Sequence, residues 1–287
     1  MANKLTFDEL REKVYEYRKL ILTLCNKAKG LHIGGDLSAA ETLVSLYQYQ
    51  MNIDPKNPDW EDRDRFILSK GHGGAALYLV MAQRGYLEMD EVFSTYKQHE
   101  TRLGMHPCKA LFPALDSSSG SLGHGLPIAA GMALAGKIDG KKYRSYCMIG
   151  DGETNEGAIW EAAMAAAQYK LGNLVVIEDV NRMCLDGFTE EVMNVEPVAD
   201  KWRAFNWNVV EIDGNDLEQV MNAFDNLPAP DSDVPTIIVA HTTKGKGVSF
   251  LTNEPTAHHT SINDEQLEAA LAEVEAEYAS AKGGKNA

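Results

Sequence analysis

Residues 150–157 read GDGETNEG and place one carboxylate, Asp151, between two glycines. The preceding run SYCMIG (145–150) is apolar and typical of a buried strand, whereas AIWEAAMAAAQYK (158–170) has the pattern of a helix rich in small residues. A polar, glycine-rich turn between a buried strand and a helix is typical of the ligand-binding edge of a parallel sheet. This stretch therefore predicts both the fold class and the place of a site.

Short apolar segments alternate with helical segments on both sides of this turn. We expect further strands over residues 64–69, 173–179, 207–213 and 235–241. We expect helices over 6–29, 37–50, 125–137, about 216–225 and 263–279, with 86–119 mostly irregular. Such alternation predicts an α/β fold: a doubly wound, mostly parallel sheet with helices on both faces.

The sequence carries no obvious linker or internal repeat, so we expect residues 1–287 to form a single domain. The first helix has a capping box at its start, because Thr6 and Glu9 stand three residues apart. The last residues, about 280–287, include GGKNA and are expected to be a disordered tail.

Composition excludes several classes of protein. The formal net charge is −15 and there is no extended basic patch, which argues against nucleic-acid binding. No apolar run approaches the roughly 20 residues that span a bilayer, and the N-terminus lacks an apolar signal core. Four cysteines without metal-knuckle spacing are typical of reduced thiols, so we expect a cytoplasmic protein.

The chemistry of the GDG turn favours a bound diphosphate. Gly152 lets the backbone approach a ligand closely, and the N-terminus of the helix that follows favours an anion. Asp151 is a hard oxygen ligand for Mg²⁺, and Asn181, 30 residues later at the end of the next strand, offers a second oxygen. A lone GDG is more simply a tight turn, but GDG and Asn in one strand–helix–strand unit favour a magnesium diphosphate site.

Seven blocks of sequence narrow this prediction further. In chain order they are LHIGGDLSAAE (31–41), DRFILSKGHGGAALY (64–78), GMHPC (104–108), SSGSLGHGLPIAAGMALAGK (118–137), GDGETNEGAIWEA (150–162), DVNRMCLDG (179–187) and TTKGKGVSF…AHH (242–259). Together they resemble the N-terminal part of transketolases, which use thiamine diphosphate, and the split N-terminal subunits most of all. The resemblance covers nearly the whole chain.

The resemblance implies a set of cofactor ligands. Asp151, Asn181 and the backbone carbonyl of Met183 would hold Mg²⁺, for which Ca²⁺ or Mn²⁺ can substitute. The residues that it places around thiamine diphosphate are His72, Gly120, Ser121, Leu122, Gly152, Glu161, Asn181 and His258.

The resemblance also implies catalytic roles. His32, His106 and His258 would face the reacting sugar, and Glu156 and Glu161 would link the two active sites of a dimer. The residues themselves agree in part, because His32, His72 and His106 lie on predicted irregular backbone and imidazole titrates near neutral pH.

Three positions depart from the expected pattern. Ile33 follows His32 where we expect proline, which puts the shape of this loop in doubt. Ala257 stands where an aromatic residue is expected before His258, so His258 and His259 could exchange roles, although the motif favours His258. His124 replaces an expected glutamine, and we expect it to lie behind the residues that touch the cofactor.

The family's pyrimidine-binding domain has no counterpart among the predicted elements. We therefore expect a separate C-terminal transketolase subunit to complete the site, in an α2β2 assembly that acts on sugar phosphates. The expected reaction transfers a two-carbon ketol unit from a ketose phosphate to an aldose phosphate. Two alternatives remain: the α subunit of a 2-oxoacid dehydrogenase, and a non-catalytic cofactor-binding module.

Overall fold

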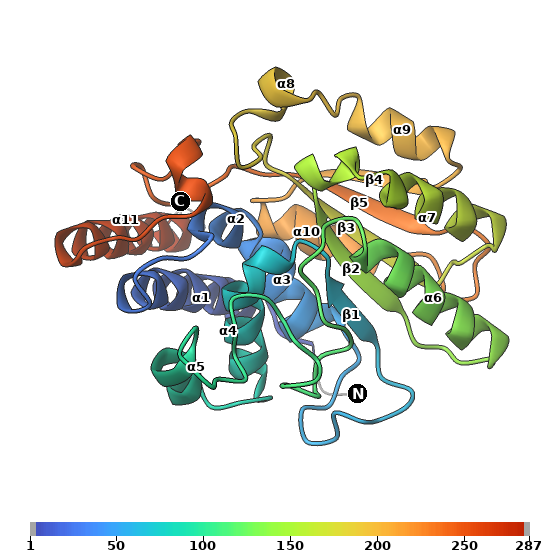
Figure 1. Cartoon of the computed structure of the whole chain (residues 1–287), viewed down its shortest axis with the longest axis horizontal. Helices are drawn as coiled ribbons and strands as arrows, with labels where there is room; N and C mark the ends of the chain where they lie inside the picture. Colours follow the sequence, from blue (N-terminus) through green and yellow to red (C-terminus); the bar gives the residue numbers. More distant parts are fainter. Residues whose placement is uncertain (1–3, 284–287) are drawn as a thin grey trace.

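A parallel five-stranded sheet forms the centre of residues 4–283, the part of the chain that this computed structural model describes (Figure 1). The strands are β1 (Arg65–Leu68), β2 (Ser145–Gly150), β3 (Leu174–Val180), β4 (Asn208–Asp213) and β5 (Thr236–His241). Their order across the sheet is β1-β2-β3-β5-β4, and every neighbouring pair is parallel. All five carboxyl ends therefore lie at one edge.

Both faces of the sheet are buried, because successive side chains of a strand point to opposite sides. In β2, Tyr146 and Met148 join the core on one face, while Cys147 and Ile149 join the core on the other. This explains why the strands are continuous apolar runs rather than alternating patterns.

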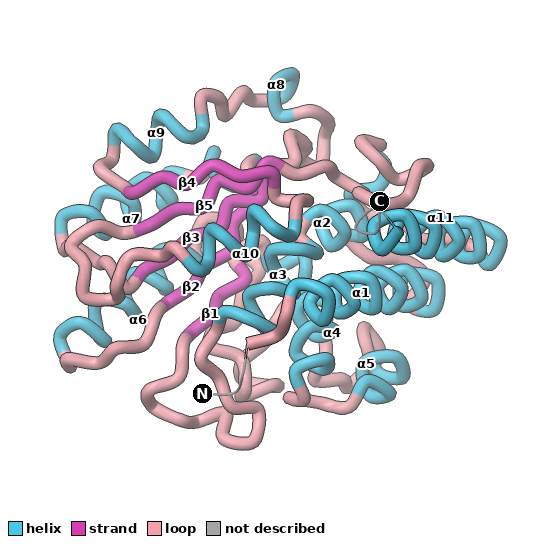
Figure 2. Tube along the Cα trace, turned by 180° about the vertical axis from the view of Figure 1, so that it is seen from behind, coloured by secondary structure: helices cyan, strands magenta, loops and turns pink. Residues whose placement is uncertain are grey.

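Helices cover each face. One layer contains α1 (Phe7–Lys27), α2 (Ile33–Ser38), α3 (Ala40–Ser45), α4 (Gly74–Arg84), α5 (Met89–Thr95), α10 (Leu217–Asp225) and α11 (Asp264–Gly283). The opposite layer contains α6 (Gly125–Ile138), α7 (Gly157–Gln168) and α9 (Val198–Ala204). Figure 1 shows α6 and α7 along their face of the sheet, and Figure 2 shows α3 and α10 on the reverse. The predicted doubly wound α/β class is confirmed.

The predicted helix over 37–50 is wrong in its start and its continuity. The helical segment begins at Ile33, breaks at Ala39 and ends in a π-helical turn over Leu46–Gln50. Glycines disfavour helix, so the sequence pattern predicts a loop at Gly34. In the structure Gly34 is required by close packing, because a Cβ there would lie 2.7 Å from the carbonyl oxygen of Ala257.

Two further helical regions escaped the sequence pattern. The segment 86–119, expected to be mostly irregular, contains α5, and the connection after β3 contains α8 (Thr189–Val192) and α9. Helix α9 is held by tertiary contacts: Trp202 is fully buried, and its indole Nε1 donates to Glu178 Oε2 at 2.7 Å. Propensity alone does not signal a helix of this kind.

Both ends of the described chain are anchored. The predicted capping box of α1 is present, since Glu9 N donates to Thr6 Oγ1 and Thr6 N donates to Glu9 Oε2. The tail expected to be disordered from about residue 280 is helical as far as Gly283, and residues 284–287 lie outside the described part. Helix α11 packs on α1 through Tyr15 and Tyr278, whose ring centroids are 4.1 Å apart.

In the described part of the chain, no helix is both long enough and apolar enough to cross a membrane.

Candidate active site

The carboxyl ends of β1, β2, β3 and β5 bring four polar segments to one edge of the sheet. Lys70 and His72 follow β1, Asp151 follows β2, Asn181 follows β3, and Lys244 follows β5. Parallel pairing aligns these exits: Gly150 pairs with Asp179, and the next residue, Asp151, donates its N–H to the carbonyl of Asp179 at 3.3 Å. Sequence-distant polar residues therefore meet where the GDG turn predicted a site.

A buried carboxylate, Asp179, organises the floor of this site. Lys70 Nζ lies 2.5 Å from Asp179 Oδ2, and Ser38 Oγ, Thr242 Oγ1 and Asn181 Nδ2 donate to the same carboxylate at 2.7, 2.5 and 3.0 Å. Burial by itself raises the pKa of Asp179, but Lys70 and the hydrogen bonds outweigh it, so the pKa is lowered. Asp179 is therefore ionised and paired, and it orients the Asn181 side chain.

Asp151 lies in a less compensated environment. Its carboxylate accepts hydrogen bonds from the N–H groups of Gly152 at 2.8 Å and Arg182 at 2.6 Å. Burial, followed by repulsion from Asp179, raises the pKa of Asp151 to about 7. A buried carboxyl with this environment gains stability from a cation, which is the property expected of a metal ligand.

The oxygen donors near Asp151 suit Mg²⁺. Asn181 Nδ2 donates to Asp179, and the amide oxygen Oδ1, which accepts from Met183 N at 3.2 Å, is the atom of this side chain that can act as a metal ligand. No group of three or more His, Cys, Asp or Glu within residues 4–283 is arranged to hold a metal ion. One carboxylate, one amide and one backbone carbonyl fit an ion that keeps water and phosphate ligands.

Four histidines meet beside this donor set. The ring centroids of His32 lie 5.0, 5.5 and 4.8 Å from those of His72, His258 and His259, respectively, and His72 and His258 are 5.3 Å apart. Burial is the main cause that lowers the pKa of His32 to about 4, of His258 to about 3 and of His72 to about 2. At neutral pH these three imidazoles are uncharged.

Lys244 joins the histidines to the proposed metal ligands. Its Nζ donates to the carbonyls of Met183 and Cys184 at 3.4 and 3.3 Å and lies 3.0 Å from His258 Nδ1. Burial and the nearby Lys70 charge lower the pKa of Lys244 to about 8. Two lysines in one buried site favour an anionic ligand.

The geometry separates His258 from His259. His258 is half-buried and contacts Lys244, whereas His259 is exposed and lies over the backbone of Gly30. The unexpected Ala257 is fully buried against Gly34, where the small side chain permits close contact between the two loops. Proximity to Lys244 supports the choice of His258, which stays a prediction.

The loop predicted to line the cofactor lies next to the GDG turn. Gly120 and Ser121 are exposed and Leu122 is half-buried. A Cβ built on Gly120 would lie 3.8 Å from the His106 ring, so the exposed His106 is at the same rim.

Three other sequence-predicted residues lie outside the histidine cluster. Glu156 is exposed at the start of α7, and Glu161 is exposed on α7, where it lines an apolar groove shared with α6. His124 is exposed before α6, and its Nδ1 lies 3.1 Å from the carbonyl oxygen of Leu122.

Sequence reasoning missed four residues that the structure brings to this edge: Lys70, Glu153, Asp179 and Lys244. A signal was present for two of them, because Lys70 and Lys244 each precede a glycine in a loop at a predicted strand exit. Asp179 and Glu153 resembled ordinary polar residues beside a motif, and only their burial distinguishes them.

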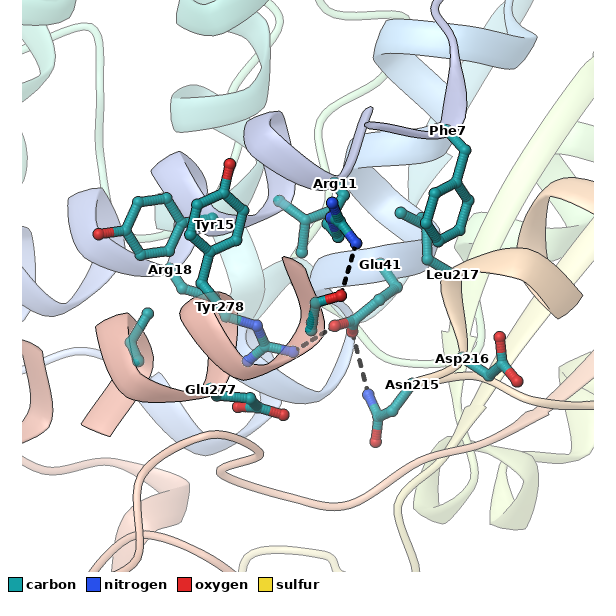
Figure 3. A pocket seen from close by; sticks show the side chains of 13 residues that line it. Phe7, Arg11, Tyr15, Arg18, Glu41, Asn215, Asp216, Leu217, Glu277 and Tyr278 are labelled. Carbon is teal, nitrogen blue, oxygen red and sulfur yellow. Dashed lines mark hydrogen bonds and ion pairs between the residues drawn. The ribbon is translucent and has the colours of Figure 1, made fainter. Parts of the chain in front are cut away.

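A second polar network lies behind the site, at a cavity of about 320 Å³ between α1, α11 and the start of α10 (Figure 3). Figure 3 shows Glu41 between Arg18 and Asn215; Arg18 Nη2 lies 2.6 Å and Asn215 Nδ2 3.1 Å from its oxygens. Asn215 Oδ1 accepts from Thr243 N at 2.8 Å, and Arg18 Nη1 donates to the carbonyl of Lys246 at 2.6 Å. This network supports the loop that carries Lys244.

Comparison with known proteins shows which proteins this chain is similar to. The chain is 41% identical over 274 residues to a protein of Actinobacillus succinogenes that is named as one of the subunits of apulose-4-phosphate transketolase, covering 95% of this chain and 98% of that protein. It is also 41% identical over 269 residues to the 6-deoxy-6-sulfo-D-fructose transketolase subunit SqwG of a Clostridium species, covering 94% and 97%.

Solved structures show the same fold in longer proteins. Transketolase from Campylobacter jejuni superposes with a TM-score of 0.88 at 29% identity, covering 94% of this chain and 43% of that one. The chain thus spans less than half the length of the solved transketolase. A family described as "Transketolase, thiamine diphosphate binding domain" matches residues 10–279. The chain therefore belongs to the transketolase family, in its thiamine diphosphate-binding domain.

Proposed function

We propose that this chain is the N-terminal subunit of a split transketolase that transfers a two-carbon ketol unit from a ketose phosphate to an aldose phosphate. The observation that carries the proposal is the convergence of Asp151 and Asn181 with three half-buried, uncharged histidines at the carboxyl edge of the sheet. A non-catalytic binding module has no need of that histidine set.

The positions of the donor groups support the following proposed cofactor contacts. Asp151, Asn181 Oδ1 and the Met183 carbonyl would hold Mg²⁺, or Ca²⁺ or Mn²⁺ in its place, and Gly152 would present its N–H to the diphosphate. The two lysines and the N-terminal end of the turn add positive potential for that anion. Thiamine diphosphate supplies, when bound, the nucleophilic carbon that attacks a ketose carbonyl and carries the two-carbon fragment.

The histidines would transfer protons and form hydrogen bonds with the oxygens of the sugar. Because Lys244 Nζ faces His258 Nδ1 at 3.0 Å, the uncharged His258 carries its proton on Nε2, which can donate to an oxygen of the ligand. His32, also uncharged near pH 7, can accept hydrogen bonds from sugar hydroxyls, and the uncharged His72 would contact the diphosphate. His106 at the rim would contact the same sugar, and Gly120, Ser121 and Leu122 the thiamine rings.

A partner is part of the proposal. Two similar relatives are named as subunits, and this chain covers nearly all of each. We propose that a C-terminal transketolase subunit carries the pyrimidine-binding domain and completes an α2β2 enzyme, with residues 1–287 acting as one diphosphate-type domain. Glu156 and the exposed Glu161 would then lie between paired active sites.

The substrate is a sugar phosphate or a close analogue. One relative is named for apulose 4-phosphate and the other for 6-deoxy-6-sulfo-D-fructose, so both a phosphate and a sulfonate occur among relatives. Family membership favours a transketolase over the α subunit of a 2-oxoacid dehydrogenase. A cytoplasmic location and a role in pentose phosphate metabolism stay predictions.

The test is to purify the chain from its native cells with whatever subunit binds it. Ketol transfer is then assayed with thiamine diphosphate and Mg²⁺ on a panel of phosphorylated and sulfonated ketoses, for the complex and for the chain alone. Transfer by the complex only is expected. No transfer by any preparation, or turnover of a 2-oxoacid in place of ketoses, would overturn the proposal.

A further inference from the structure

Glu153 is a buried carboxylate that holds three loops together. It is only 3% exposed and lies in the short 3-10 turn directly after the GDG glycines. Its Oε1 accepts from Gly123 N at 2.8 Å and from Ser69 Oγ, and its Oε2 accepts from Gly150 N at 3.1 Å. The donors come from three different segments: the exit of β1, the loop before α6 and the end of β2.

Ser69 extends this link to the start of α6. Ser69 is fully buried, and while it donates to Glu153 its Oγ accepts from Gly125 N at 3.0 Å. A Cβ added to Gly125 would overlap Ser69, and one added to Gly71 would lie 2.8 Å from the carbonyl carbon of Ser119. The β1 exit and the loop before α6 are thus in backbone contact.

The turn that carries Glu153 is itself braced from both sides. Thr154 Oγ1 donates to the carbonyl of Asp151 at 2.6 Å, and Trp160 Nε1 donates to the carbonyl of Thr154 at 2.8 Å. Glu153 therefore has a fixed backbone position relative to Asp151. Through the hydrogen bond from Gly123 N, its side chain also fixes the position of the loop at Gly123 relative to Asp151.

We infer that Glu153 is a positioning residue that sets the distance between the diphosphate-binding turn and the loop 120–122, and so aligns the two ends of the cofactor. The inference rests on the proposed function, in which the diphosphate lies at Gly152 and the thiamine rings lie at the loop 120–122. Because Glu153 is buried and both of its oxygens accept hydrogen bonds from the protein, it would act through the loops that it joins and not by contact with the cofactor.

A carboxylate suits this role better than an amide. Both of its oxygens accept, so all three donors are satisfied at once. Glu153→Gln keeps the shape but turns one acceptor into an NH₂ donor, which must then face either Gly150 N or the pair of Gly123 N and Ser69 Oγ. One of the links between the loops is therefore broken without a change of volume.

The experiment compares two ligands in wild type and Glu153→Gln, with the full chain and any subunit that co-purifies with it. Calorimetry measures the Kd of thiamine diphosphate and the Kd of inorganic diphosphate, both at saturating Mg²⁺. Inorganic diphosphate occupies only the turn, whereas thiamine diphosphate spans both loops. We expect about tenfold weaker binding of thiamine diphosphate and less than about threefold change for inorganic diphosphate.

Two further variants keep the inference testable. Ser69→Ala removes one of the three donors and leaves the carboxylate, so it should shift the ratio of the two Kd values in the same direction but less, even where Glu153→Gln fails to fold. Glu265→Gln, an exposed glutamate on α11, should leave both Kd values and the thermal midpoint unchanged.

The outcomes separate this inference from the proposed function. Equal weakening of both ligands, or no weakening of either, in both site variants would overturn the positioning role of Glu153. Failure of the wild-type protein to bind thiamine diphosphate at all would instead overturn the proposed function, and the inference would fall with it. Selective loss of thiamine diphosphate binding supports both.

Discussion

Two buried polar networks lie back to back, and they are built differently. Behind the loop of Lys244, Arg18 and Glu41 are paired at 2.6 Å with side chains only 6% and 9% exposed. At the carboxyl edge of the sheet, Asp151 lacks a basic side chain at hydrogen-bond distance among the described residues, and three histidines are held uncharged. The charges of Arg18 and Glu41 are paired within the chain, whereas the front network holds, beside its own Lys70–Asp179 pair, groups that gain from a ligand.

The contrast shows how stability and function are divided. A paired buried charge that loses its partner costs several kcal/mol, so the rear network should govern folding. A buried carboxylate held near its own pKa should cost little stability when it is neutralised, but should govern ligand binding. Each of the following changes tests one side of this division, in decreasing order of expected effect.

The largest effect is expected from Glu41→Ala. It leaves the Arg18 guanidinium buried without its carboxylate and should lower the free energy of unfolding by about 3 kcal/mol. Urea denaturation measures this, and the exposed Lys4–Asp225 pair gives the matched control: Lys4→Met should change stability by less than about 1 kcal/mol. Similar losses of unfolding free energy in the two variants would show that the buried Arg18–Glu41 pair stabilises the fold no more than an exposed ion pair does.

The second largest effect is expected on the binding of thiamine diphosphate by the variant Asp151→Asn. Asp151→Asn keeps the size of the side chain but removes the negative charge proposed to hold Mg²⁺, and should weaken thiamine diphosphate binding by about 100-fold, or about 2.7 kcal/mol. Its free energy of unfolding should change by about 1 kcal/mol or less, because loss of a poorly compensated buried charge offsets a lost hydrogen bond. Calorimetry measures the Kd of thiamine diphosphate, and urea denaturation of the same sample measures the free energy of unfolding. An unchanged Kd would contradict the assignment of Asp151 as a metal ligand.

The third effect is a pH dependence of the cofactor-free protein. The pKa of His72 falls from about 6.5 when unfolded to about 2 when folded, mainly through burial, and that of His32 falls to about 4. Between pH 6.5 and pH 4 the unfolded state binds more protons, so stability is lost as pH falls through this range. Asp36 and Asp151, whose pKa values are raised to about 8 and about 7, act in the opposite direction, so the histidine contribution is measured as a difference between variant and wild type. His72→Asn should lose less stability than the wild type as pH falls from 6.5 to 4, measured as thermal midpoints. An identical slope in the variant would exclude His72 as a contributor.

The smallest effect is expected from Glu161→Gln. Because Glu161 is exposed on α7, the substitution should change the stability of the chain alone by less than about 0.5 kcal/mol. A role between paired active sites would appear only in the assembled enzyme, as altered cofactor binding at the second site. Equal cofactor binding by the variant and wild-type assemblies would show that Glu161 does not belong to the proposed site.

Much of the architecture was predictable from sequence. The strand β2 was predicted with its observed bounds, and the other strands within about one residue, because each is a short run rich in apolar residues; all except the edge strand β4 are largely buried on both faces. The place of Asp151 and Asn181 at one edge followed from the same pattern, since consecutive parallel strands end at the same side of a sheet.

The three-dimensional structure alone decided which polar residues matter around them. Asp179 and Glu153 look like any acidic residue beside a motif, but each is buried and accepts hydrogen bonds from several loops. The helix that begins at Ile33 and the helix around Trp202 likewise depend on contacts with distant segments. Local sequence determined the strands, the turns and the motif residues, because these depend on periodicity and backbone preference. Burial, pKa and loop-to-loop spacing were decided only by tertiary structure, because they are set by neighbours 30 to 141 positions away in the chain.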